Sequence, residues 1–194
     1  MVMYVDDPFL IGANGDDSLF GSAANETLRG NNGNDIARAG SGNDLVYGGN
    51  GDDQLYGGAG NDQLFGDNGD DILVGGTGND ALTGGRGEDL FLFDNATATG
   101  VDHVLDFGRS DRLLFTVQLA DPDHDGVIAL GANGILALQA GSTIEIDAAG
   151  GAARALHLLG TENVDGVNYY SYGIENEHGS HFAALGAHGN AYLV

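Results

Sequence analysis

Residues 48–83 read GGNGDDQLY GGAGNDQLF GDNGDDILV GGTGNDALT, which are four nine-residue units in a row. The same frame extends in both directions without insertion or deletion, so that residues 12–92 form nine consecutive units. The shared pattern is Gly-Gly-x-Gly-x-Asp-x-U-x, in which U is a large apolar residue. A repeat this short describes one small structural unit stacked on itself, and it therefore determines the fold ahead of local propensity.

Two positions of the repeat have a constant chemistry. Position six is an acid in all nine units, and position eight is apolar in all nine. Residues two apart in a strand lie on the same face, so both side chains of each unit point to the same side. We expect a six-residue turn followed by a three-residue strand, because glycine permits positive φ and Asn-Gly steps favour turns.

Units of this kind are expected to wind into an all-β solenoid, a parallel β-helix or β-roll, in which unit i stacks on unit i+2. Identical turns then lie above one another, and their acids repeat about every 4.8 Å, the spacing between strands. Carboxylates this close repel each other, and a cation between successive turns removes the repulsion. Oxygen ligands in flexible geometry suit Ca²⁺ better than Mg²⁺, and the repeats contain no cysteine or histidine for softer metals.

The sequence predicts calcium ligands at position six and at the glycines of positions two and four. The predicted ligands are Asp17, Gly33, Asp35, Gly42, Asp44, Gly49, Gly51, Asp53, Gly58, Gly60, Asp62, Gly69, Asp71, Gly76, Gly78, Asp80, Gly85, Gly87 and Asp89. Nine stacked units leave seven gaps between turns, and we expect about five or six strong Ca²⁺ sites there. Unit two, GSAANETLR, departs from the pattern with Ala24 and Glu26. Glu26 therefore belongs to a second set of candidate ligands, apart from the aspartates above. Ala39, which opens unit four, is a milder change.

Composition limits the possible partners. Acids outnumber bases 29 to 6, and the formal net charge is −23. This charge opposes binding to nucleic acid and to anionic membranes, and it favours cations. The absence of cysteine excludes disulfides and thiolate metal sites. The first residues, MVMYVDDPFLIG, have neither a basic region nor a long apolar run, so we expect neither a conventional signal peptide nor a membrane span.

After residue 92 the period stops and glycine becomes less frequent. Short apolar runs between turn residues predict strands at 90–93, 103–107 and 112–115, followed by a small antiparallel β domain. The strands of that domain are expected at 135–139, 143–146, 155–159, 168–172 and 182–185. A short helix at 152–159 is the alternative for the third of these.

Two acidic clusters in this half of the chain are further candidates for calcium binding. Asp102, Asp106 and Asp111 are expected either to bind a terminal Ca²⁺ or to cap the ends of strands. A second cluster matches the first half of an EF-hand loop, although Ala132 stands where the loop's glutamate belongs. Its acids are Asp121, Asp123 and Asp125. About one or two more ions are therefore expected here, with solvated turn aspartates as the alternative.

The repeats resemble those of the RTX (repeats-in-toxin) family of secreted calcium-binding proteins. The resemblance implies a right-handed parallel β-roll with Ca²⁺ in its turns, a smaller β-rich C-terminal cap, and export by a type I system through an uncleaved C-terminal signal. Residues 91–94 and 102–113 are similar to the cap that follows the last repeat of RTX proteases. We accordingly expect a lead-in at 1–11, a roll at 12–92, and a cap at 93–194 with the secretion signal in roughly its last 50 residues.

No enzymatic activity is expected, because the chain has neither H-E-x-x-H nor a G-x-S-x-G elbow. The first hypothesis is a secreted, extracellular protein that stays unfolded at low Ca²⁺ and folds on binding it. The second is a non-catalytic export and stabilisation module of a larger secreted protease, lipase or polysaccharide epimerase. The third is a surface or matrix adhesin, although the aromatic residues at position nine are expected to pack as a β-ladder. Calcium and the type I secretion machinery are the partners expected in each case.

Overall fold

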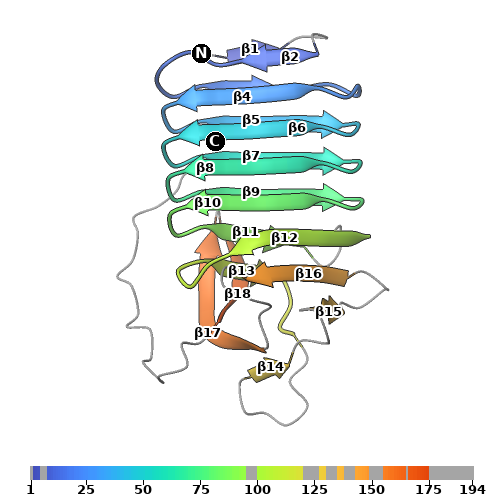
Figure 1. The fold of residues 1–194 in the computed structure, drawn as a ribbon, viewed down its shortest axis with the longest axis vertical. Coiled ribbons are helices and arrows are strands. Elements are labelled where there is room, and N and C mark those ends of the chain that lie inside the picture. Colours follow the sequence, from blue (N-terminus) through green and yellow to red (C-terminus); the bar gives the residue numbers. More distant parts are fainter. Residues whose placement is uncertain are drawn as a thin grey trace.

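The computed structural model describes residues 2–4, 8–94, 100–119, 127–129, 135–137, 143–148, 155–164 and 166–174. Every element in these ranges is a strand, so the described part of the chain is all-β. The parallel strands of the repeat region, with those just before and after it, form a β-solenoid of about six turns (Figure 1). The fold class predicted from the period is therefore confirmed. No helix that is long and apolar enough to cross a membrane occurs among the described residues.

Strands of the lead-in and of the repeat region alternate between two sheets and are parallel to their neighbours. The first sheet contains the odd-numbered strands and the second contains the even-numbered strands. Their bounds are β1 (Val2–Tyr4), β2 (Phe9–Ile11), β3 (Ser18–Phe20), β4 (Thr27–Asn32), β5 (Ile36–Ser41), β6 (Leu45–Asn50), β7 (Gln54–Ala59), β8 (Gln63–Asn68), β9 (Ile72–Thr77), β10 (Ala81–Arg86) and β11 (Leu90–Phe93). Each strand pairs with the strand two further along, as Leu55 with Leu73. One coil is thus two units, and unit i stacks on unit i+2.

The strands are longer, and the turns shorter, than the sequence predicts. Strand β7, for example, covers positions seven to nine of one unit and positions one to three of the next. Pairing with β9 continues across the junction between the two units, since Gly58 lies beside Gly76 and Ala59 beside Thr77. Consecutive coils have the same length, so their turns also stack in register and extend the ladder. From unit three onward, only positions four to six remain outside the strands.

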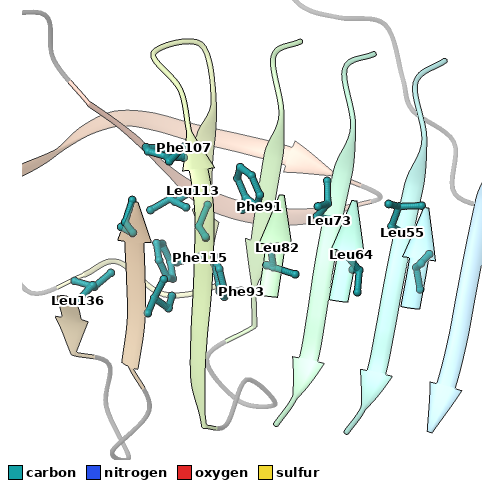
Figure 2. Close-up of a cluster of buried hydrophobic side chains, with 14 of the residues drawn as sticks. Leu55, Leu64, Leu73, Leu82, Phe91, Phe93, Phe107, Leu113, Phe115 and Leu136 are labelled. Atoms are coloured by element: carbon teal, nitrogen blue, oxygen red, sulfur yellow. The ribbon is translucent and has the colours of Figure 1, made fainter. Parts of the chain in front are cut away.

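The core of the roll is a single column of apolar side chains between the two sheets. All nine residues at position eight are completely buried. They are Leu19, Leu28, Ala37, Val46, Leu55, Leu64, Leu73, Leu82 and Phe91. Figure 2 shows the later members of this column, with Leu55 and Leu73 on one sheet facing Leu64 and Leu82 on the other. The same-face prediction for position eight is confirmed.

Beyond the repeats, the chain continues both sheets. Strand β12 (Val101–Phe107) pairs in parallel with β10, and β13 (Arg112–Phe115) pairs in parallel with β11. In the even sheet, β16 (Thr143–Ala148) is parallel to β12 and β15 (Ile135–Ala137) is antiparallel to β16. In the odd sheet, β18 (Val167–Gly173), β17 (Ala155–Val164) and β14 (Val127–Ala129) follow β13 as antiparallel strands.

Most strands predicted after residue 92 coincide with observed ones, although β17 and β18 extend past the predicted bounds. The helix considered for 152–159 is wrong where the structure describes it, since residues 155–164 form a strand paired on both sides. The strands after residue 92 join the two sheets of the roll and do not form separate sheets. The predicted strand at 182–185 lies outside the described residues, and the division of the chain at residue 92 stays a prediction.

A second apolar cluster lies on the outer face of the odd sheet. Ile72, Leu92 and Leu114 point away from the core column and pack with Val164 and Tyr169 of the β17–β18 hairpin. Strand β17 crosses the direction of the roll's strands at this place (Figure 1). The hairpin therefore covers the outer face of the last coils, where a solenoid otherwise exposes apolar surface.

The core column predicts a sharp contrast between neighbouring residues of β8. Replacing the buried Leu64 with alanine removes apolar contacts on all sides and should lower the free energy of unfolding by about 2–5 kcal/mol. The preceding residue, Gln63, is exposed, so Gln63→Ala should change the free energy of unfolding by less than about 0.5 kcal/mol. Urea denaturation of both variants measures the difference. Equal effects would mean that the column does not carry the stability of the roll.

Candidate metal centre

The nine acids at position six lie at the turns, immediately before the strands that carry the core column. All of them are buried, with exposed fractions between 0% for Asp71 and 4% for Asp17. Glycine-rich turns leave no side chain to cover a carboxylate from solvent, so this burial comes from stacking one turn on the next. The sequence prediction that the acids share the inward face with position eight is confirmed.

The buried acids form two rows, one along each edge of the roll. The row of the odd units consists of Asp17, Asp35, Asp53, Asp71, Asp89 and Asp111, and the row of the even units consists of Glu26, Asp44, Asp62, Asp80 and Asp102. Within a row, the backbone N–H of each acid donates to Oδ1 of the acid one coil further on. These bonds are 2.7 Å long at the start of the odd row and 3.3 Å at its end. The bonds account for one oxygen of each accepting carboxylate.

The second carboxylate oxygen of the interior acids has no partner. It is buried and accepts no hydrogen bond in seven aspartates, which is exceptional for a polar atom in a folded protein. These are Asp35, Asp44, Asp53, Asp62, Asp71, Asp80 and Asp89. Leaving a buried carboxylate oxygen unsatisfied costs about 1–3 kcal/mol or more. A regular row of such oxygens is the arrangement expected where cations bind.

A backbone carbonyl of the adjacent coil lies near the unpaired oxygen of Asp35, Asp53, Asp62 and Asp71. At unit five, a Cβ built on Gly48 would collide with Asp53 Oδ2 and would lie 2.8 Å from the carbonyl oxygen of Gly66, one coil away. The equivalent position at Gly57 would meet Asp62 Oδ2 and, at 2.7 Å, the carbonyl of Gly75. Position one therefore has to be small, because a carboxylate oxygen and a carbonyl oxygen converge on the space that a side chain would fill.

Carboxylates alone do not complete a coordination sphere. Within the described ranges, no three acid or histidine side chains gather around one point. Any ion in these turns would therefore take most of its ligands from carbonyl oxygens, which is common for Ca²⁺. The glycines at positions two and four stay predicted ligands, and Gly60 shows how closely the turns stack. A Cβ on Gly60, whose φ is +135°, would overlap the carbonyl oxygen of Gly42.

Burial raises the pKa of the interior carboxyls well above the ordinary value of 3.8. The pKa is raised to about 6 for Asp44 and Asp62, to about 7 for Asp53 and Asp89, and to about 8 for Asp71. Burial is the largest cause for each. The N–H bond along the row partly offsets it, and repulsion between stacked carboxylates adds to it, as Asp53 and Asp89 act on Asp71. The rows therefore resist carrying full negative charge in the absence of a compensating cation.

Asp102 and Asp111 continue the rows beyond the repeats. They lie 22 residues after Asp80 and Asp89, not 18, and accept the backbone N–H groups of those acids at 3.1 and 3.3 Å. They are still nine residues apart and are followed two residues later by the buried Val104 and Leu113. The repeat thus resumes after a four-residue displacement. That signal is present in the sequence, but it is concealed because Gly100, two residues before Asp102, is the one repeat glycine kept at its position in these two units.

Asp106 has a different environment from the row acids. Its two carboxylate oxygens accept the backbone N–H groups of Gly84 and Gly85 at 2.9 and 2.8 Å. Asp111 Oδ2 similarly accepts the N–H of Gly108 at 2.6 Å. These contacts fit the predicted alternative in which turn aspartates cap strand ends. The EF-hand-like acids Asp121, Asp123 and Asp125 lie outside the described residues.

Aromatic side chains at position nine pack against one another on the outside of the sheets. The rings of Tyr47 and Phe65 stack with centroids 5.1 Å apart, and the guanidinium of Arg29 lies 4.2 Å from the Tyr47 ring. On the other sheet, Arg38 lies between the rings of Phe20 and Tyr56, at 5.9 and 4.7 Å. The ring faces are occupied by these neighbours, as expected for a β-ladder.

Comparison with known proteins identifies the repeat region. The family model of the RTX calcium-binding nonapeptide repeat (4 copies) matches residues 9–37, 29–64 and 65–95. Among solved structures, the crystal structure of extracellular lipase LipA from Serratia marcescens matches at 21% identity and a TM-score of 0.32, over 72% of this chain and 37% of the lipase chain. This chain thus spans little more than a third of that lipase. A search of curated proteins finds no match. The predicted resemblance of the repeats is confirmed.

The raised pKa values predict a pH-dependent fold in the absence of calcium. Between about pH 4 and pH 8 the folded roll binds more protons than the unfolded chain, so stability is greatest below the ordinary carboxyl pKa and is lost as the pH rises through about 6–8. In excess chelator, we expect more β-structure at about pH 5 than at about pH 8 by far-ultraviolet circular dichroism. Greater structure at the higher pH would contradict the burial of charge in the rows.

Proposed function

Since residues 9–95 are RTX calcium-binding repeats arranged as a β-roll, we propose that this chain folds by binding several Ca²⁺ ions between its stacked turns. The single observation that carries the proposal is the row of buried carboxylate oxygens without a partner. Each would be satisfied by an ion shared with the carbonyl oxygens of the adjacent coil. The RTX repeat itself is a non-catalytic calcium-binding module, and no reaction is assigned to the chain.

The proposed ligands are the seven interior aspartates of the rows together with glycine carbonyls of the turns. On this proposal, five gaps lie between acids of the repeats, and two more are closed by Asp102 and Asp111. Burial raises the pKa of Asp102 to about 7, as it does for the repeat acids, which supports the same role. The first acids, Asp17 and Glu26, are bonded differently, because donors of their own turns already reach them.

Calcium would act as a folding switch. Without it, the stacked carboxylates repel and stay partly protonated, and the glycine-rich turns leave the chain with high conformational entropy to lose. Extracellular calcium modules bind with dissociation constants of about 10⁻⁴–10⁻³ M, far above the concentration inside cells. Binding free energy then becomes folding free energy only after the chain has left the cell.

The family supports an extracellular location, and we propose type I export through a signal in roughly the last 50 residues. The chain would act either as a secreted calcium-binding protein or as the non-catalytic C-terminal module of a larger secreted enzyme. The intact mass of the native secreted protein separates these two. An adhesin role has less support, since the outer aromatic rings are stacked on one another in the described strands.

Addition of Ca²⁺ to the metal-free chain at neutral pH should produce a large gain of β-structure. The reason is that neutralised rows allow the turns to stack, and we expect the midpoint near 10⁻⁴–10⁻³ M, on the order of other extracellular modules. Circular dichroism during titration with Ca²⁺, and then with chelator, measures the change and its reversal. Mg²⁺ at equal concentration is the control and should produce much less structure. Full structure in excess chelator would exclude calcium as the switch.

Two adjacent carboxylates should differ strongly in their effect on calcium binding. Asp71 is fully buried in the odd row, whereas Asp70 is exposed on the outside of the same turn. Asp71→Asn should raise the midpoint Ca²⁺ concentration by about tenfold, equivalent to ~1.4 kcal/mol, and Asp70→Asn should leave it nearly unchanged. Both variants remove one negative charge, so the pair separates ligation from net charge. Similar shifts in the two midpoints would argue against Asp71 as a calcium ligand.

A further inference from the structure

The acids of the first coil have donors from their own turns, unlike the interior acids. Asp17 Oδ2 accepts the backbone N–H of Ala13 at 2.6 Å. In unit two, the hydroxyl of Ser22 donates to Glu26 Oε1, and the N–H of Ala24 donates to Ser22 Oγ at 3.3 Å. In both units, the residue at position two supplies the donor. The corresponding oxygen of the seven interior aspartates accepts no hydrogen bond.

The backbone explains why this bond stops after the first coil. From unit three to unit nine, position two has a positive φ in every unit. The residues are Asn31, Gly40, Gly49, Gly58, Asp67, Gly76 and Gly85. Asn31 and Asp67 adopt φ of 82° and 75° at this position although they are not glycine, so the turn imposes the conformation. Ala13 and Ser22 do not adopt it, and their N–H and hydroxyl groups turn toward the acid instead.

The position of the acid oxygens differs accordingly. A Cβ built at position one would lie 2.8 Å from Asp17 Oδ2 and 3.1 Å from Glu26 Oε2, farther than from the acid oxygen in any later unit with glycine there. Unit two also lacks the positive φ at position four, which later turns have, because Ala24 replaces glycine. Glu26 Oε2 itself has no hydrogen-bond partner, but its carboxylate already accepts the Ser22 hydroxyl.

We infer that the first coil binds no Ca²⁺, and that the calcium array begins with Asp35 on one edge and Asp44 on the other. The inference rests on the proposed function and sets the limit of the array. The N–H of Ala13 occupies the oxygen of Asp17 that has no partner in later coils. Glu26 keeps an unpaired Oε2, but its turn lacks the positive φ at positions two and four that every later turn has. At the other end, the bond from Gly108 N–H to Asp111 Oδ2 closes the odd row in the same way.

The test is the number of Ca²⁺ ions bound per full-length chain at saturation, measured by equilibrium dialysis and elemental analysis. Asp17→Asn keeps an acceptor for the Ala13 N–H, and Glu26→Gln keeps one for Ser22. Both variants should bind as many ions as the wild type. Asp53→Asn, the matched change in the interior, should bind at least one ion fewer. Circular dichroism in saturating Ca²⁺ verifies folding, and Asp17→Asn decides alone if Glu26→Gln does not fold.

The reverse change restores the repeat pattern to unit two. The triple variant Ser22→Gly, Ala24→Gly, Glu26→Asp should bind one ion more than the wild type. Loss of an ion in folded Asp17→Asn or Glu26→Gln, or no gain in the folded triple variant, would overturn the inference. A wild-type chain that binds no Ca²⁺ would instead overturn the proposed function, so the two failures are distinguishable.

Discussion

Electrostatic repulsion between stacked carboxylates is the constraint on which the whole roll depends. Each coil places two acids, one in each row, directly beside the matching acids of the next coil, at a spacing of about one strand separation. The hydrophobic core offsets only part of this repulsion, because it contributes two side chains at position eight for every eighteen residues. On the proposed function, bound calcium removes charge from the rows. Protons can do so in part, because burial raises the pKa of Asp53 to about 7 and of Asp71 to about 8, and on the proposed function calcium does so at neutral pH.

The glycines follow from the same constraint. A cation between two turns requires oxygen ligands from both, and carbonyl oxygens approach closely only where no Cβ stands between them. At Gly60, any larger side chain would overlap the carbonyl of Gly42. The cost is a flexible unfolded chain, since glycine loses more conformational freedom on folding than any other residue. Tight turns and dependence on a ligand are thus two consequences of one sequence pattern.

The period predicts most of this structure, because position six and position eight keep their chemistry through all nine units. Strand length is less predictable, since the pairing of positions one to three depends on stacking between coils and not on local propensity. The continuation of the rows to Asp102 and Asp111 was concealed by a four-residue displacement and by the loss of all but one of the repeat glycines. The bond from Ser22 to Glu26 was not foreseen either, because it depends on the backbone conformation at position two.

The bonding within a row has a consequence for cooperativity on the proposed function. Each interior aspartate uses one oxygen to accept the N–H of the preceding coil and has the other available for an ion, as Asp53 and Asp71 do. An ion that fixes Asp71 therefore also fixes the acceptor for the backbone of Asp53, which forms part of the neighbouring site. Coupling of this kind acts between nearest neighbours and propagates along the row, as in other solenoids. At the two ends of the odd row, Asp17 and Asp111 accept hydrogen bonds from their own turns. On the proposed function, the coupling therefore stops at these residues, and calcium dependence is confined to the coils between them.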